Sequence, residues 1–180
     1  MALPWYAVYT RHQHEKTVAR LLTCKGFETL LPLYSAVRRW KNGINQLSLP
    51  LFPCYVFLQG GIERWLPVLT TPGIHNVVGF GGKPAVIPIS EIEAIRRVVE
   101  SPLRAEPCPF VKCGDQVRMI AGPLEGLEGI LLRKKSQWKL LISVEMLERS
   151  VSVEVDAYMV ERIPAAKPGL ACTGRRQTLC

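Results

Sequence analysis

The chain has 180 residues, of which 48% are apolar, and a formal net charge of +8. This length allows one ordinary domain or two small ones, and the apolar content suffices for a packed core, so we expect a globular protein. The positive charge favours a polyanionic partner such as nucleic acid, although surplus lysine also keeps proteins soluble. No apolar run reaches membrane-spanning length and no leader-like segment opens the chain, so we expect a cytoplasmic protein without membrane contact.

Strands and helices alternate over residues 1–100 and predict an α/β domain. Gly26 is placed to end the first helix, and Ser90 with Glu93 matches a capping box at the start of the last one. An Asn-Gly pair predicts the tight turn of a basic hairpin over residues 37–44. The expected strands cover 5–10, 27–33, 52–58 and 74–80, and the expected helices cover 11–25, 63–69 and a segment that opens at Ser90.

Residues 50–58 carry the strongest single signal, because they predict a strand with no polar face. An amphipathic surface strand alternates apolar and polar side chains, whereas both faces are apolar here. Either the strand is central in a sheet that is covered on both sides, or one face docks another protein. One face would carry Phe52, Cys54, Val56 and Leu58, and the other would carry Pro53, Tyr55 and Phe57.

Residues 101–113 contain three prolines and few periodic apolar residues, so they predict a stiff linker at a domain boundary. The pattern after the linker is purely β and predicts a small barrel of about five strands over residues 114–163. Residues 164–180 have too few apolar side chains to pack, and we expect a mobile tail. The fold class is therefore α+β with two domains, an N-terminal α/β sandwich followed by a small five-stranded β-barrel. The expected barrel strands are 116–120, 129–135, 139–145 and 149–155.

Motifs for catalysis, cofactors and metals are missing from the sequence. His12 and His14 are two residues apart and match no pattern with a nucleophile or a metal partner. No Gly-rich phosphate loop or HExxH motif occurs. The six cysteines form no CxxC pair, we expect them to be reduced, and Cys24 and Cys54 are interpreted as small core residues. We therefore predict a protein that is not an enzyme and holds no cofactor or metal, although a triad assembled from distant residues would leave no local pattern.

Two basic clusters are candidates for nucleic-acid contact. One lies on the first helix and the other on the hairpin, beside Trp40. Cations neutralise phosphates and an indole stacks on a base, which suits a weakly sequence-dependent single-strand contact. The alternative is a solvated hairpin with Trp40 folded back on the sheet. The clusters consist of Arg11, Lys16, Arg20 and Lys25, and of Arg38, Arg39 and Lys41.

Motifs in both halves of the chain carry a family resemblance. They are Trp5–Tyr9 before a helix, Pro50–Phe57, Pro72–Ile74 with Gly79–Gly82, Pro88–Ser90, Gly114–Arg118 and Gly122–Gly129. Over residues 4–163 the chain resembles the NusG family of transcription elongation factors. Its Pro-Leu-Phe-Pro segment is similar to that of the specialised RfaH- and UpxY-like paralogues. The resemblance implies an NGN-type N-terminal domain that binds RNA polymerase, then a linker and a KOW-type, SH3-like β-barrel.

The resemblance also implies partners and site residues. In this family an apolar face of the N-terminal domain grips the clamp helices of RNA polymerase and suppresses pausing. By matched position this face carries Tyr9, Phe52, Pro53, Tyr55 and Phe57, with Trp65 and Leu66 on the flanking helix. Upstream DNA and the non-template strand would face Arg11, Arg38, Arg39 and Lys41.

The barrel tip is the family's contact for Rho or a small-subunit ribosomal protein. It consists here of Met146, Leu147, Glu148 and Arg149, so that Leu147 and Glu148 replace the usual aromatic residue and glycine. An aliphatic side chain buries less surface than a phenylalanine, which implies a weaker or different partner. We expect a monomeric elongation and antitermination factor. The alternative is a KOW-type RNA-binding or ribosome-associated protein.

Overall fold

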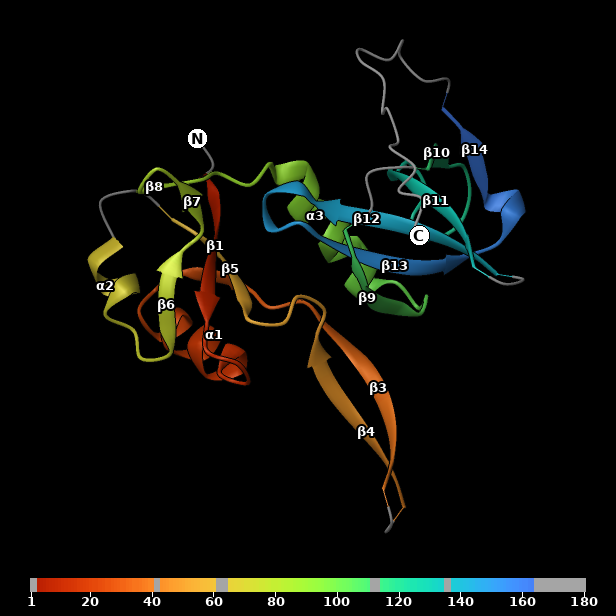
Figure 1. The fold of residues 1–180 in the computed structure, drawn as a ribbon. Coiled ribbons are helices and arrows are strands. Elements are labelled where there is room, and N and C mark those ends of the chain that lie inside the picture. Colours follow the sequence, from red (N-terminus) through yellow and green to blue (C-terminus); the bar gives the residue numbers. More distant parts are fainter. Residues whose placement is uncertain (1–2, 41–42, 61–64, 111–113, 135–136, 164–180) are drawn as a thin grey trace, which may run out of the picture.

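The computed structural model describes residues 3–40, 43–60, 65–110, 114–134 and 137–163 (Figure 1). The N-terminal half is built from β1 (Trp5–Thr10), α1 (Glu15–Cys24), β2 (Glu28–Leu30), β5 (Tyr55–Gln59), α2 (Trp65–Leu69), β6 (Ile74–Val77) and α3 (Ile89–Glu100), with a small hairpin of β7 (Gly79–Phe80) and β8 (Lys83–Pro84). A four-stranded antiparallel sheet in the order β2-β5-β1-β6 forms its centre. No helix in the described part of the chain is long and apolar enough to cross a bilayer.

Both faces of this sheet are covered by helices. Val56 and Leu58 of β5 pack in one apolar cluster with side chains of α1 and α2. Phe57, which points to the opposite face, packs in a second cluster with Ile92 and Ile95 of α3. Of the two alternatives for this strand, coverage on both sides therefore applies to Val56, Phe57 and Leu58 of β5, whereas Tyr55 is only half-buried.

The predicted strand 52–58 begins later than expected, at Tyr55. Cys54 has a φ of +69°, which is the left-handed region and interrupts an extended strand. The backbone instead makes a turn, in which the Tyr55 N–H donates to the Phe52 carbonyl at 3.1 Å. Alternation along the strand therefore applies only from Tyr55 onward.

Both main helices differ from prediction at their first turn. α1 begins at Glu15 rather than at residue 11, because residues 11–14 form a turn in which Gln13 has a φ of +64°. At its other end Gly26 follows the helix with a φ of +81°, as predicted. The capping box at Ser90 is wrong: Pro88 occupies the N-cap position, so Ser90 already lies inside the first turn of α3, where it cannot cap the helix.

The basic hairpin is longer than predicted. β3 (Leu33–Trp40) and β4 (Gly43–Pro50) pair over their whole length as a separate two-stranded sheet. Figure 1 shows this hairpin projecting away from the rest of the molecule. Residues 41 and 42 lie outside the described residues, so the type of the expected Asn-Gly turn stays a prediction.

The C-terminal half forms one six-stranded antiparallel sheet in the order β14-β10-β11-β12-β13-β9. All four strands that the sequence predicts there are confirmed. The described residues of β14 and β9, at the two edges, are not paired with each other, so closure into a five-stranded barrel is not confirmed. The elements are β9 (Ala105–Pro109), β10 (Asp115–Met119), β11 (Glu128–Lys134), β12 (Gln137–Val144), η2 (Glu145–Leu147), β13 (Arg149–Val155), η3 (Ala157–Met159) and β14 (Val160–Arg162).

Part of the predicted linker is an edge strand. β9 pairs with β13, with Pro107 opposite Val151. Prolines are tolerated here because an edge strand has one side without ladder partners. The assignment of a domain boundary near residues 101–113 stays a prediction.

Helix α3 joins the two halves. It packs on the six-stranded sheet beside β12 (Figure 1), and its apolar side chains share one continuous cluster with Leu140 and Ile142. The Arg97 guanidinium donates to the Glu125 carbonyl at 2.5 Å. In this structure, therefore, the halves are packed against each other.

Candidate functional site

An aromatic surface lies at one end of the N-terminal sheet. Tyr9 and Tyr55 are register partners in β1 and β5, and their ring centroids are 5.5 Å apart. The His75 ring lies 5.7 Å from Tyr9. Tyr9 is 40% exposed although every other residue of β1 is buried, and Tyr55 is half-buried. We call Tyr9, Tyr55 and His75 the tyrosine surface; exposed Pro53 lies close by in the chain.

Two of the predicted face residues are core residues instead. Phe52 is 1% exposed and Phe57 is 0% exposed, and their rings meet edge to face at 5.4 Å. Both belong to the apolar cluster that α3 covers. The expectation that Phe52 and Phe57 are available on an exposed face is therefore wrong for this structure.

Trp65 and Leu66 lie away from the tyrosine surface. The Trp65 ring packs edge to face on Tyr6 at 4.8 Å and joins the cluster formed with α1. Tyr6 and Tyr9 are three positions apart in β1 and therefore point to opposite faces of the sheet. Leu66 is exposed on α2. The structure thus does not bring these two residues together with Tyr9 and Tyr55.

The predicted partner-binding tip is turned inward. Leu147 is only 6% exposed and belongs to the continuous apolar cluster, against which Met146 is also packed. In this conformation Leu147 is therefore not available to the partner that the resemblance implies, and the partner contact stays a prediction. Burial is favoured because the free energy falls when the leucine side chain moves from water into an apolar environment.

Electrostatics place this tip beside the N-terminal half. Burial raises the pKa of Tyr55, and the positive charge of Arg149 opposes that shift. Burial also raises the pKa of Glu91, in the first turn of α3, to about 6, and Glu145 adds to that rise. Figure 1 shows the turn between β12 and β13 next to α3. The tip therefore lies close both to α3 and to Tyr55.

The basic residues occupy two neighbouring elements. Arg11 and Arg20 are exposed at the start and on the side of α1. The Lys16 ammonium donates to the Ser48 carbonyl at 2.8 Å and so ties α1 to β4. Arg38 and Arg39 lie near the outer end of β3, and Lys41 lies outside the described residues.

A cluster that the sequence analysis missed lies at the start of α1. His12, Glu15 and Cys54 bring an imidazole, a carboxylate and a thiol together. Burial raises the pKa of the Cys54 thiol, and the neighbouring Glu15 carboxylate acts in the same direction. Cys24 is exposed and Cys54 is half-buried, so their interpretation as core residues is wrong. No local spacing could have revealed a contact that joins residues about 40 positions apart in sequence.

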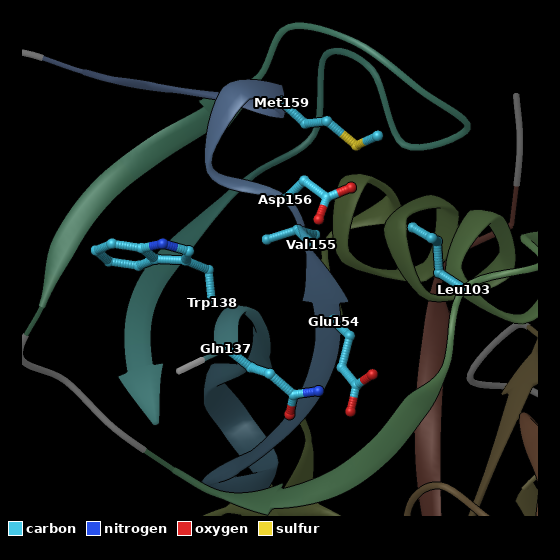
Figure 2. A pocket seen from close by; sticks show the side chains of 7 residues that line it. All are labelled: Leu103, Gln137, Trp138, Glu154, Val155, Asp156 and Met159. Carbon is cyan, nitrogen blue, oxygen red and sulfur yellow. The ribbon is translucent and has the colours of Figure 1, made fainter. Parts of the chain in front are cut away.

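A cavity in the C-terminal half does not have the character of a ligand site. Figure 2 shows the Trp138 ring and Leu103 on opposite sides of it, with Val155 and Asp156 between them. Its volume is about 230 Å³, below the range of roughly 300–1,000 Å³ that small-molecule sites occupy. It is lined by Leu103, Gln137, Trp138, Glu154, Val155, Asp156 and Met159.

Comparison with known proteins identifies the family. A family model described as "Transcription termination factor nusG" matches residues 3–96, more than half of the chain. The transcription termination/antitermination protein NusG of Pseudomonas aeruginosa is 29% identical over 177 residues, covering 91% of this chain and 100% of that protein. The protein of the same name from Lactococcus lactis is 28% identical over 168 residues, covering 89% of this chain and 90% of that protein.

A solved structure agrees with the fold. It is described as "Domain interaction in Thermotoga maritima NusG" and superposes with a TM-score of 0.56 at 23% identity, covering 89% of this chain and 97% of that one. At this identity the likeness concerns the fold alone. Together with the family match over the N-terminal half, the motifs in both halves lead to one conclusion: this chain belongs to the NusG family of transcription factors.

Proposed function

We propose that this chain is a transcription elongation and antitermination factor that binds the clamp helices of RNA polymerase through the tyrosine surface. Membership of the NusG family supports the transcriptional role. In this proposal the chain is a cytoplasmic monomer that acts by binding its partners rather than by catalysis. The observation that carries the polymerase contact is that Tyr9 is exposed and Tyr55 half-buried in β1 and β5, the two central strands, whose other side chains are mostly buried.

Tyrosine pairs of this kind suit a protein interface. A tyrosine offers a large rigid ring at low conformational cost and a hydroxyl that stays hydrogen-bonded to water or to a partner. The two rings already contact each other at 5.5 Å, so little ordering is needed on binding. Of the expected face residues, we therefore retain Tyr9, Tyr55 and the nearby Pro53 for the polymerase contact.

The basic hairpin supplies the nucleic-acid contact in this proposal. β3 and β4 project beyond the sheet (Figure 1), and Arg38, Arg39 and Lys41 lie at the outer end in sequence. We propose that they face the non-template strand or upstream DNA once polymerase is bound. Arg11, in the turn before α1, and Arg20, on α1, are exposed and add positive charge to the same half of the molecule.

The C-terminal sheet supplies the partner contact. We propose that the tip at residues 146–149 binds Rho or a small-subunit ribosomal protein. Because Leu147 is buried beside the N-terminal half here, this contact requires the tip to leave its present position.

Polymerase binding by single-ring variants tests the proposal. Tyr9→Ala and Tyr55→Ala should each weaken binding of purified core polymerase by about 30-fold, which corresponds to roughly 2 kcal/mol for an interface anchor. Tyr158→Ala is a matched control, because Tyr158 is an exposed tyrosine on η3 in the C-terminal half. Unchanged polymerase binding by folded Tyr9 and Tyr55 variants would contradict the contact. Co-purification with ribosomal RNA instead of polymerase would favour the ribosome-associated alternative.

A further inference from the structure

Three side chains with metal-binding atoms converge next to the tyrosine surface. One ligand atom each from His12, Glu15 and Cys54 lies within 4.8 Å of the other two. Cys54 Sγ and His12 Nδ1 are 3.8 Å apart. Tetrahedral zinc, with Zn–S of about 2.3 Å and Zn–N of about 2.0–2.1 Å, would place a thiolate and an imidazole nitrogen about 3.6 Å apart. The separation in this chain is thus close to what a shared zinc ion requires.

The backbone holds the thiol in place at a conformational cost. The Cys54 N–H donates to Glu15 Oε1 at 2.8 Å, and the Thr10 N–H donates to the Cys54 carbonyl at 2.8 Å. Cys54 has a φ of +69°, and Gln13, in the turn that carries His12, has a φ of +64°. Side chains at left-handed positions are strained and persist where the surroundings fix them, often at functional sites. A cysteine thus occupies a position that glycine would occupy with less strain.

The charge at the cluster also favours a cation. Glu15 is 3% exposed, and within the described residues none of the ion pairs involves it. Burying a carboxylate without a cationic partner costs free energy. The positive end of the α1 helix dipole, at the first turn, offsets only part of that cost. A cavity of about 500 Å³ between α1 and the hairpin is lined by His12 and Glu15, so ions and water can reach the cluster.

We propose that His12, Glu15 and Cys54 form a zinc site, with water as the fourth ligand. The ligand set of one sulfur, one nitrogen and one oxygen suits Zn²⁺, whereas Mg²⁺ and Ca²⁺ prefer oxygen alone. The prediction from sequence that the chain holds no metal is replaced by this proposal, which does not depend on the proposed polymerase contact. The ion would join the turn before α1 to the turn before β5.

Metal binding to the full-length chain tests the site directly. Metal-free reduced protein is titrated with Zn²⁺ against a chromophoric chelator, and with Co²⁺ to observe thiolate-to-cobalt charge transfer and tetrahedral bands. Cys54→Gly, His12→Ala and Glu15→Gln should each lower zinc affinity by about 100-fold or more, since loss of outer-shell partners alone costs about 10–100-fold. Cys24→Ser and His14→Ala are matched controls outside the cluster and should bind like the parent.

Cys54→Gly separates loss of a ligand from loss of the fold. Glycine suits a φ of +69°, so this variant should melt at the same temperature as the metal-free parent or higher. Zn²⁺ should raise the melting temperature of the parent and leave that of Cys54→Gly unchanged. Failure of the parent to bind zinc, equal zinc affinity in Cys54→Gly, or equal loss in Cys24→Ser would overturn the proposal. Glu15 would then serve only as an acceptor for the Cys54 N–H.

Discussion

Two hairpins of similar length have opposite surroundings in this molecule. β3 and β4 have eight residues each, and β12 and β13 have eight and seven. Within the described residues β3 and β4 pair only with each other, whereas β12 and β13 lie inside a six-stranded sheet. The β3–β4 hairpin projects from the molecule, and the β12–β13 turn packs beside α3 (Figure 1).

The sequence predicts that both tips contact partners, and their composition explains why the two differ. The β3–β4 tip carries Arg38, Arg39 and Lys41, and charged groups are costly to bury without partners. The β12–β13 tip carries Leu147, and the free energy of the protein falls when this apolar side chain is removed from water. Without a partner, an apolar tip packs on its own protein, whereas a basic tip is favoured in solvent. The following predictions test this difference.

The largest effect is expected at the buried tip. Leu147→Ala should lower the free energy of unfolding by about 2–4 kcal/mol, because it deletes a buried leucine side chain. Val37→Ala on the projecting hairpin is the control and should change it by less than about 0.5 kcal/mol, because Val37 is exposed. Denaturant unfolding at neutral pH measures both. A loss at Leu147 as small as at Val37 would mean that this tip is released in solution.

A weaker effect, confined to nucleic-acid binding, is expected at the projecting tip. The logarithm of the binding constant for single-strand DNA falls linearly with the logarithm of the salt concentration, and we call the steepness of this line the salt slope. Changing Arg38, Arg39 and Lys41 together to glutamine should make the line shallower by about 2, because each phosphate that is no longer neutralised reduces the steepness by about 0.7. Binding titrations at several salt concentrations measure the slope. Lys83→Gln, an exposed lysine on β8, should leave it unchanged. An unchanged slope in the triple variant would show that the hairpin is only a solvated surface.

A pH-dependent effect is expected where the buried tip meets α3. Burial first, and then Glu145, raise the pKa of Glu91 from 4.5 to about 6 in the folded state. The folded protein therefore favours the protonated carboxyl and loses stability as the pH rises from 4.5 to 6. Glu91→Gln should raise the melting temperature at pH 7 and remove this loss. Thermal melts across that pH range measure it.

The neighbouring Glu93→Gln, at an exposed site on the same helix, should keep the parent's pH dependence. If the Glu91 and Glu93 variants gave the same profile, the tip would not be packed against α3 in solution.

The smallest effect is expected at Glu148. Its φ of +47° is strained for a side chain, so Glu148→Gly should raise the free energy of unfolding by about 0.5 kcal/mol. Glu161→Gly in β14 should instead lower it by about 0.5–1 kcal/mol, because a glycine inside a strand is entropically unfavourable. Denaturant unfolding compares them, and destabilisation by both would show that the left-handed turn is not kept in solution.

Elements with a local signal could be predicted from the amino-acid sequence. Apolar periodicity located β1 and the four C-terminal strands, and Gly26 marked the end of α1. The order of short motifs indicated the family, because turn residues and strand patterns are written in adjacent positions. The two apolar faces of the 50–58 segment left two alternatives open, and only the folded structure shows that helices cover both sides of β5.

The way in which those elements meet depends on the folded molecule as a whole. The left-handed backbone at Cys54, the pairing of β9 with β13 and the burial of Leu147 each depend on residues far away in sequence. The same holds for His12, Glu15 and Cys54, which are brought together by the docking of α1 against the turn before β5. A local pattern determines what a segment prefers, but the free energy gained from long-range burial and hydrogen bonding selects which neighbour it meets.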